Sequence, residues 1–113
     1  WSAVVSILKL GVYIIVFSCL SAYICLLPIK NIYITGILCG ITEITNGIYL
    51  IGRFPVPLFY QTILILAVNA FGGFSTVMQT AGITKRSSFG IKKYICGKLL
   101  LTVLTCLHCI VLL

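Results

Sequence analysis

Four apolar segments determine what this chain of 113 residues can fold into: residues 3–27, 32–51, 58–82 and 94–113. Each is about as long as the roughly 20 residues that a helix needs to cross a bilayer. Hydrophobic residues make up 61% of the chain and charged residues only 8%, whereas soluble domains contain about 25% charged residues. We therefore predict an all-α, polytopic membrane protein with three or four transmembrane helices. Residues 1–113 form a single membrane domain, which we expect to be the C-terminal part of a longer chain.

Glu43 is the only acidic residue of the chain, and it lies within the second apolar segment. On one continuous helix, Gly36, Gly40 and Gly47 would share a face with this carboxylate. Glycines allow another backbone to approach closely, and an acid inside a membrane normally faces the interior of the bundle or a wet cavity. This face therefore predicts a cleft. Glu43 either binds a ligand or a proton there, or pairs with a lysine or with backbone amides to hold helices together.

The second segment can form one spanning helix or two half-helices that re-enter the same side of the membrane. Asn46 and Gly47 are weak helix formers, and a local break is tolerated beside a cavity. If a break occurs, we expect it near residues 45–47. Residues 52–57 contain two prolines and a glycine, so they form a loop that ends the segment.

The third segment carries amide and hydroxyl side chains along one arc of a helix. The glycine pair in the middle of this arc is where a kink or a break would form most easily. In lipid such a face must turn inward. It either forms hydrogen bonds between helices, each worth about 1 kcal/mol, or lines a binding site near the middle of the membrane. The arc comprises Gln61, Asn69, Gly72, Ser75, Thr76 and Gln79.

The net charge of +7 comes from eight basic residues that lie at the ends of the apolar segments. We interpret them as topology signals and as anchors to the lipid bilayer, and we do not predict nucleic acid as a partner. The basic loop 84–93 is predicted to be cytoplasmic, and Lys98, one turn inside the last segment, can snorkel to the interface. The count of positive charges does not distinguish a spanning from a re-entrant second segment, because Lys9 and Lys30 merely exchange sides.

The six cysteines lie within or at the edges of apolar segments, and we interpret them as small packing residues. Cys106 and Cys109 flank His108, but a second pair of metal ligands is lacking in the sequence, so no metal site and no cofactor is predicted. One histidine, one glutamate and no aspartate also offer little for catalysis. We do not predict an enzyme.

Two motifs in succession resemble the nucleoside-recognition, or Gate, domain of bacterial membrane proteins. They are Gly40-Ile-Thr-Glu43-Ile-Thr45-Asn46-Gly47 and Asn69-Ala-Phe-Gly72-Gly73-Phe-Ser75-Thr-Val-Met-Gln79. More narrowly, the chain looks like the C-terminal part of the YlbJ-type sporulation integral membrane proteins. In that family a Gly-x-x-Glu-x-Thr-x-Gly element precedes Phe-Gly-Gly-Phe-Ser, an amide-bearing helix, a basic loop and a last helix. The resemblance covers nearly the whole chain.

The resemblance implies a distant relation to concentrative nucleoside transporters, in which a hairpin glutamate and a serine-bearing segment contact the nucleoside. By position, Glu43 corresponds to that glutamate and Ser75 to that serine. The transporter motif has Gln before the glutamate and Ala-Pro after it, whereas this chain has Thr42 and Ile44-Thr45. The YlbJ-type family is associated with movement of dipicolinic acid across the outer forespore membrane. For such a dianion, Glu43 would have to be protonated or paired with a lysine.

We therefore expect the substrate-binding part of a bacterial membrane transporter for a small polar or anionic metabolite, with dipicolinate during sporulation as one candidate. One alternative is a structural or interaction protein needed for spore formation, and another is nucleoside transport or recognition. The expected partners are a small-molecule substrate and the rest of the parent chain or a second copy, and the expected location is the bacterial cell membrane or the outer forespore membrane. The expected substrate-binding residues are Glu43, Thr45, Asn46, Asn69, Ser75, Thr76 and Gln79. The glycines expected at helix breaks or packing contacts are Gly36, Gly40, Gly47, Gly72 and Gly73.

Overall fold

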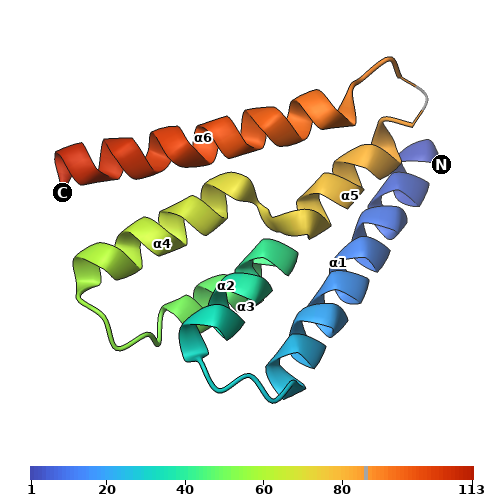
Figure 1. Ribbon diagram of the computed structural model, residues 1–113. Coiled ribbons are helices and arrows are strands. Elements are labelled where there is room, and N and C mark those ends of the chain that lie inside the picture. Colours follow the sequence, from blue (N-terminus) through green and yellow to red (C-terminus); the bar gives the residue numbers. More distant parts are fainter. Residues whose placement is uncertain (86) are drawn as a thin grey trace.

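The computed structural model describes residues 1–85 and 87–113, and these residues form helices and connecting loops. Three stretches are long and apolar enough to cross a membrane, namely Ser2–Leu26, Leu58–Ile83 and Ile91–Leu112. The predicted all-α, polytopic membrane fold is confirmed. In chain order the helices are α1 (Ser2–Leu26), α2 (Ile32–Thr42), α3 (Ile44–Ile51), α4 (Leu58–Phe71), α5 (Gly73–Ile83) and α6 (Ile91–Leu112) (Figure 1).

The second apolar segment forms two half-helices, α2 and α3, which we call the hairpin. With 11 and 8 residues they are about 16 Å and 12 Å long, well short of the roughly 30 Å hydrocarbon core of a bilayer. The chain reverses at Glu43, whose backbone is extended (φ −148°, ψ 124°), and the two helices pack against each other (Figure 1). Of the two alternatives for this segment, the structure has the pair of half-helices.

The break in the hairpin lies at Glu43, so the predicted position near residues 45–47 is wrong by two residues. The physical reason is that Glu43 itself caps α3, which leaves the following residues free to form the first helical turn. Because the helix is interrupted, Glu43 and the glycines do not share a face of one continuous helix. Instead Gly40 and Gly47 face each other across the hairpin, so closely that a Cβ on Gly47 would overlap the backbone of Gly40.

The open end of the hairpin is closed by Phe54, which is 4% exposed. Its ring lies against Gly36, where a Cβ would collide with it, and meets the ring of Tyr33 edge to face at 5.0 Å between centroids. Asn31 begins α2 by accepting hydrogen bonds from the backbone N–H groups of Tyr33 (2.9 Å) and Ile34 (3.4 Å). The loop 52–57, which ends the hairpin, was predicted correctly.

The third segment is interrupted at the glycine pair, as predicted. Gly72 and Gly73 have φ values of 83° and 74°, a left-handed conformation that residues with a side chain adopt only at a cost. α4 therefore ends at Phe71 and α5 begins at Gly73. Together they form one broken segment that is long and apolar enough to cross a membrane.

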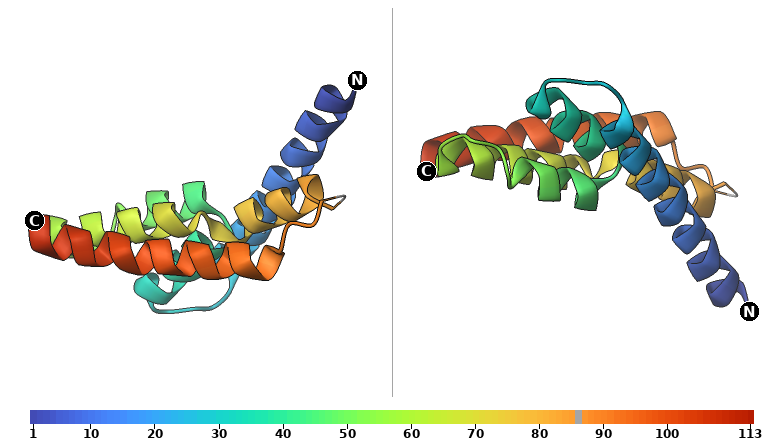
Figure 2. Two further views of the ribbon diagram at one scale, coloured as in Figure 1. Left: turned by 90° about the horizontal axis from the view of Figure 1, so that it is seen from above. Right: turned by 90° about the horizontal axis from the view of Figure 1, so that it is seen from below.

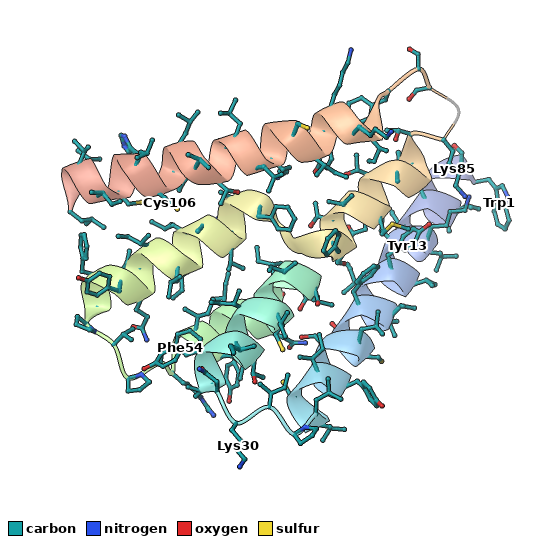
Figure 3. The ribbon with its side chains drawn as sticks, viewed as in Figure 1. Trp1, Tyr13, Lys30, Phe54, Lys85 and Cys106 are labelled. Atoms are coloured by element: carbon teal, nitrogen blue, oxygen red, sulfur yellow. The ribbon has the colours of Figure 1, made fainter. Side chains whose placement is uncertain are left out.

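The hairpin lies between α1 and α4, and α4 packs along α6 (Figure 1). α1 is inclined to α4 and α6, so that its N-terminal end projects from the other helices (Figure 2). Trp1 and Lys85 lie at one end of α1 and Lys30 at the other (Figure 3). Lys9 therefore shares a side with the basic loop, which spans residues 84–90 because α6 already begins at Ile91. The loop includes Arg86, which lies outside the described residues.

Candidate functional site

The reversal of the hairpin and the break between α4 and α5 lie against each other. A Cβ on Gly73 would be 3.3 Å from the carbonyl oxygen of Thr42 and 3.4 Å from both Cα and N of Glu43. Helix ends carry backbone N–H and C=O groups without helical partners, and lipid offers them none. This contact therefore gathers the ends of two interrupted membrane segments at one place.

Glu43 lies at this contact and is only 5% exposed. Its carboxylate accepts hydrogen bonds from two backbone N–H groups, those of Thr45 (to Oε1, 3.1 Å) and Asn46 (to Oε2, 3.0 Å). A carboxylate at the N-terminal end of a helix is also favoured by the helix dipole. Of the partners considered from the sequence, lysine or backbone amides, the structure gives Glu43 the amides.

Thr45 and Asn46 contribute to this arrangement through their backbones. The side chain of Thr45 is exposed and that of Asn46 is half-buried, and both N–H groups point to the carboxylate. The structure thus brings together three of the predicted site residues around the start of α3. It assigns two of them the role of N–H donors.

The polar residues of α5 form a second group. Ser75 is 2% exposed, and its hydroxyl accepts a hydrogen bond from the amide of Gln79 one turn later (3.0 Å). Thr76 donates its hydroxyl to the carbonyl of Gly72 (2.6 Å), which stabilises the break itself. Within the described residues, the Ser75 hydroxyl hydrogen and the Gln79 amide oxygen have no partner, so both remain able to bond a ligand.

The break at Gly72 and Gly73 divides the predicted polar arc between two helices. Gln61, on α4, donates to the carbonyl of Ile51 (3.1 Å) and so fastens the end of the hairpin to α4. Asn69, also on α4, is exposed. The structure therefore groups Ser75, Thr76 and Gln79 on α5 and leaves Asn69 apart from them.

Lys98 belongs to this region, although sequence reasoning did not place it there. Its ammonium group lies 3.4 Å from the carbonyl oxygen of Ala70, in the last turn of α4, and 5.8 Å from the ring centroid of Tyr94. The last carbonyls of a helix carry its negative end, which favours a cation. The signal in the sequence was a lysine one turn inside an apolar segment. Its partner lies on another helix, so the spacing of residues along the chain does not reveal it.

The electrostatics of the region follow from these contacts. Glu43 meets the positive end of α3, Lys98 meets the negative end of α4, and the Thr42 carbonyl oxygen lies against Gly73 at the positive end of α5. Each of these broken ends thus faces a group of opposite sign. In the described part of the chain, no three His, Cys, Asp or Glu side chains are grouped so as to hold a metal ion.

Three hollows open in the described part of the chain. One of about 430 Å³ opens between α2, α4 and α6, is lined mainly by apolar side chains, and reaches Phe71 and Phe74 on either side of the glycine pair. One of about 540 Å³ lies between the start of α1 and the end of α5. The third hollow lies beside α6. None of the three is lined by Glu43, Ser75 or Gln79. Glu43 and Ser75 are themselves buried, so the two helix breaks are packed closed.

Comparisons of the chain with protein-family models, with curated proteins and with solved structures find no match.

Proposed function

We propose that this chain forms the substrate-binding part, or gate, of a bacterial membrane transporter for a small polar or anionic metabolite. The proposal is carried by one observation, the contact of Gly73 with Thr42 and Glu43, which joins two interrupted membrane segments. Secondary transporters bind substrates and coupling ions at such interrupted helices, because helix ends offer polar groups where the membrane offers none. Regular packing of uninterrupted helices would not require either break.

The chemistry of the region suits a ligand with oxygen or nitrogen acceptors and donors. Ser75 can donate its hydroxyl hydrogen and Gln79 can accept through its amide oxygen. The two N–H groups at the start of α3 now bind Glu43, and a carboxylate of a substrate could take the place of one Glu43 oxygen there. These N–H and hydroxyl donors suit an anion such as dipicolinate, for which Glu43 would have to be protonated or paired with a lysine.

The proposal requires the hairpin to move. The breaks are packed closed, so a substrate could reach Ser75 and Gln79 only after the hairpin separates from α5. At Gly73 the contact between them is made with the backbone of Thr42 and Glu43. We therefore assign this structure to a state in which access to the site is shut.

A second function, assembly without transport, is favoured by a different observation. Both oxygens of Glu43 are already bonded within the hairpin, and Gln79 bonds Ser75 on the same helix. Under this alternative the polar groups only stabilise the breaks of a structural protein of the spore-forming cell. Substitutions would then lower the amount of folded protein, and no separate loss of transport would follow.

We further propose that the end containing Lys9 and the basic loop faces the cytoplasm, in the cell membrane or the outer forespore membrane. The support is the distribution of charge. Lys85 lies at this end and shares a hollow with Lys9, whereas Lys30 lies at the other end (Figure 3). Lys92 and Lys93 follow the basic loop at the start of α6, and Arg53 lies in the loop that ends the hairpin. Positive residues are more frequent on the cytoplasmic side of membrane proteins.

The test of the substrate class is uptake by the complete parent protein reconstituted in liposomes, with dipicolinate and a panel of nucleosides. Saturable uptake of dipicolinate alone supports the anion proposal, and uptake of nucleosides alone would replace it with nucleoside transport. No uptake of either class by folded protein would favour the assembly function.

A further inference from the structure

Two cysteines on different helices lie in contact on the side of the hairpin that faces α1. The Sγ atoms of Cys25, in the last turn of α1, and Cys39, in α2, are 3.6 Å apart. Cys39 is completely buried and also donates its thiol to the carbonyl of Ser21 (3.5 Å), whereas Cys25 is exposed. One accessible thiol therefore lies directly beside one sheltered thiol.

We propose that Cys25 and Cys39 form a thiol–disulfide exchange site, which takes a disulfide oxidant as its reactant and ends as a covalent bond between α1 and the hairpin. The proposal does not depend on transport. The two sulfurs already lie at van der Waals contact, and a disulfide requires them to approach to roughly 2.0 Å.

The remaining cysteines do not offer this arrangement in the described part of the chain. Cys19 and Cys96 are exposed, and the structure shows no other sulfur in contact with theirs. Cys106 and Cys109 lie on the same helix, so a bond between them would constrain nothing outside α6. The pair between α1 and α2 is the one that links separate membrane segments.

The unequal exposure of the two thiols fixes the order of the reaction. The Cys25 thiolate attacks a small disulfide such as oxidised glutathione, a Cys25–glutathione bond forms, and one glutathione thiolate leaves. The Cys39 thiolate then attacks Sγ of Cys25 and releases the second glutathione. Cys25 and Cys39 lose two electrons and two protons in total, and the oxidant becomes two thiols. Cys39 cannot begin the reaction, because no oxidant reaches it.

The position of the pair suits such a reaction. Cys25 lies at the end of α1 that leads to Lys30, opposite the end with the basic loop. If the basic loop is cytoplasmic, Cys25 faces the other side, where protein thiols are oxidised more readily.

The test exposes the purified protein, in detergent micelles, to oxidised glutathione and then to trypsin. Cleavage after Lys9, Lys30 and Arg53 gives peptides 10–30 and 31–53, which contain Cys25 and Cys39 respectively. We expect the two peptides to be linked, to separate after dithiothreitol, and to be linked to the same extent at different protein concentrations. Unlinked peptides, with glutathione stable on peptide 10–30, would overturn the proposal.

Three variants test the order of the steps. In Cys39→Ser, glutathione should remain on peptide 10–30, because no second thiol displaces it. In Cys25→Ser, Cys39 should stay unmodified and unlinked. Cys19→Ser is the matched control, since Cys19 lies in the same peptide, and it should keep the link. Loss of the link in Cys19→Ser, or its persistence in Cys25→Ser, would contradict the assignment, and the helical circular dichroism of each variant shows that it is folded.

Discussion

Gly73 lies directly against Glu43, so closely that a Cβ on Gly73 would require the backbone of the hairpin to shift by a few tenths of an ångström. A Cβ on Gly73 would stand 3.4 Å from both Cα and N of Glu43, and the glycine has a positive φ of 74°. The break in one membrane segment is thus shaped to receive the break in another. Both interruptions become understandable together, because each supplies the polar surroundings that the other requires inside a membrane.

Alanine at Gly73 tests this contact. Gly73→Ala should lower the free energy of unfolding by about 1–2 kcal/mol, because alanine is strained at this φ and its Cβ meets the hairpin backbone. Gly97→Ala, on α6, is the control, since a Cβ there meets no atom within 4 Å and should raise stability by at most about 1 kcal/mol. Unfolding by SDS in mixed micelles, followed by circular dichroism, measures both. Equal effects of the two substitutions would contradict the contact.

Alanine at Gly47 tests the packing of the hairpin. Its Cβ would overlap the backbone of Gly40, so α2 and α3 must separate, and we expect a loss of about 1–3 kcal/mol in the free energy of unfolding. Gly11→Ala, on α1, meets no atom within 4 Å and should have little effect. The same SDS titration applies. If Gly47→Ala proves as stable as Gly11→Ala, the helices do not pack as described.

Lys98 should stabilise the broken end of α4. Lys98→Met keeps the length of the side chain but removes the donor to the Ala70 carbonyl, and we expect it to cost about 1 kcal/mol of unfolding free energy. Lys93→Met removes an exposed lysine of the same helix and serves as the control. If Lys98→Met loses no more unfolding free energy than Lys93→Met, the ammonium group of Lys98 lies at the membrane–water interface and does not bond the Ala70 carbonyl.

The hairpin makes a prediction about sidedness. Asn31→Cys and Arg53→Cys should react with a membrane-impermeant maleimide from one side of the membrane, and Ser87→Cys from the other. Mass spectrometry of the tryptic peptides distinguishes the new cysteines from the native ones. Reaction of Asn31→Cys and Arg53→Cys from opposite sides would mean that residues 32–51 span the membrane.

Much of the fold could be predicted from the sequence because lipid imposes simple rules. Long apolar stretches predicted α1 and α6, and the glycine pair predicted the break between α4 and α5. The break in the hairpin was misplaced by two residues because Glu43 both ends α2 and caps α3, and weak helix formers nearby do not reveal such a cap. Local preferences are outweighed there by one side chain and two backbone amides.

The grouping of the candidate site was harder to predict, because it depends on contacts between segments. Angular positions on an ideal helix placed Asn69 and Ser75 on one broad arc, but a break rotates one half of the segment relative to the other. The contact of Lys98 with Ala70 and that of Cys25 with Cys39 join residues far apart in the sequence, and no spacing encodes them. What the sequence did indicate was the residue types: a buried acid, buried hydroxyls and glycines at close contacts.

The most direct measurement of the central claim is uptake of dipicolinate by liposomes that contain the complete parent protein, its Glu43→Gln variant or its Ser75→Ala variant. Thr105→Val is the matched control, because it removes a membrane hydroxyl that bonds only the Leu101 carbonyl of its own helix. We expect saturable uptake by the wild type and the control, and a loss of at least tenfold in both site variants at equal amounts of folded protein. A double variant with both Glu43→Gln and Ser75→Ala is measured in the same way. Unaltered uptake of dipicolinate by this double variant would contradict a binding site at the two helix breaks.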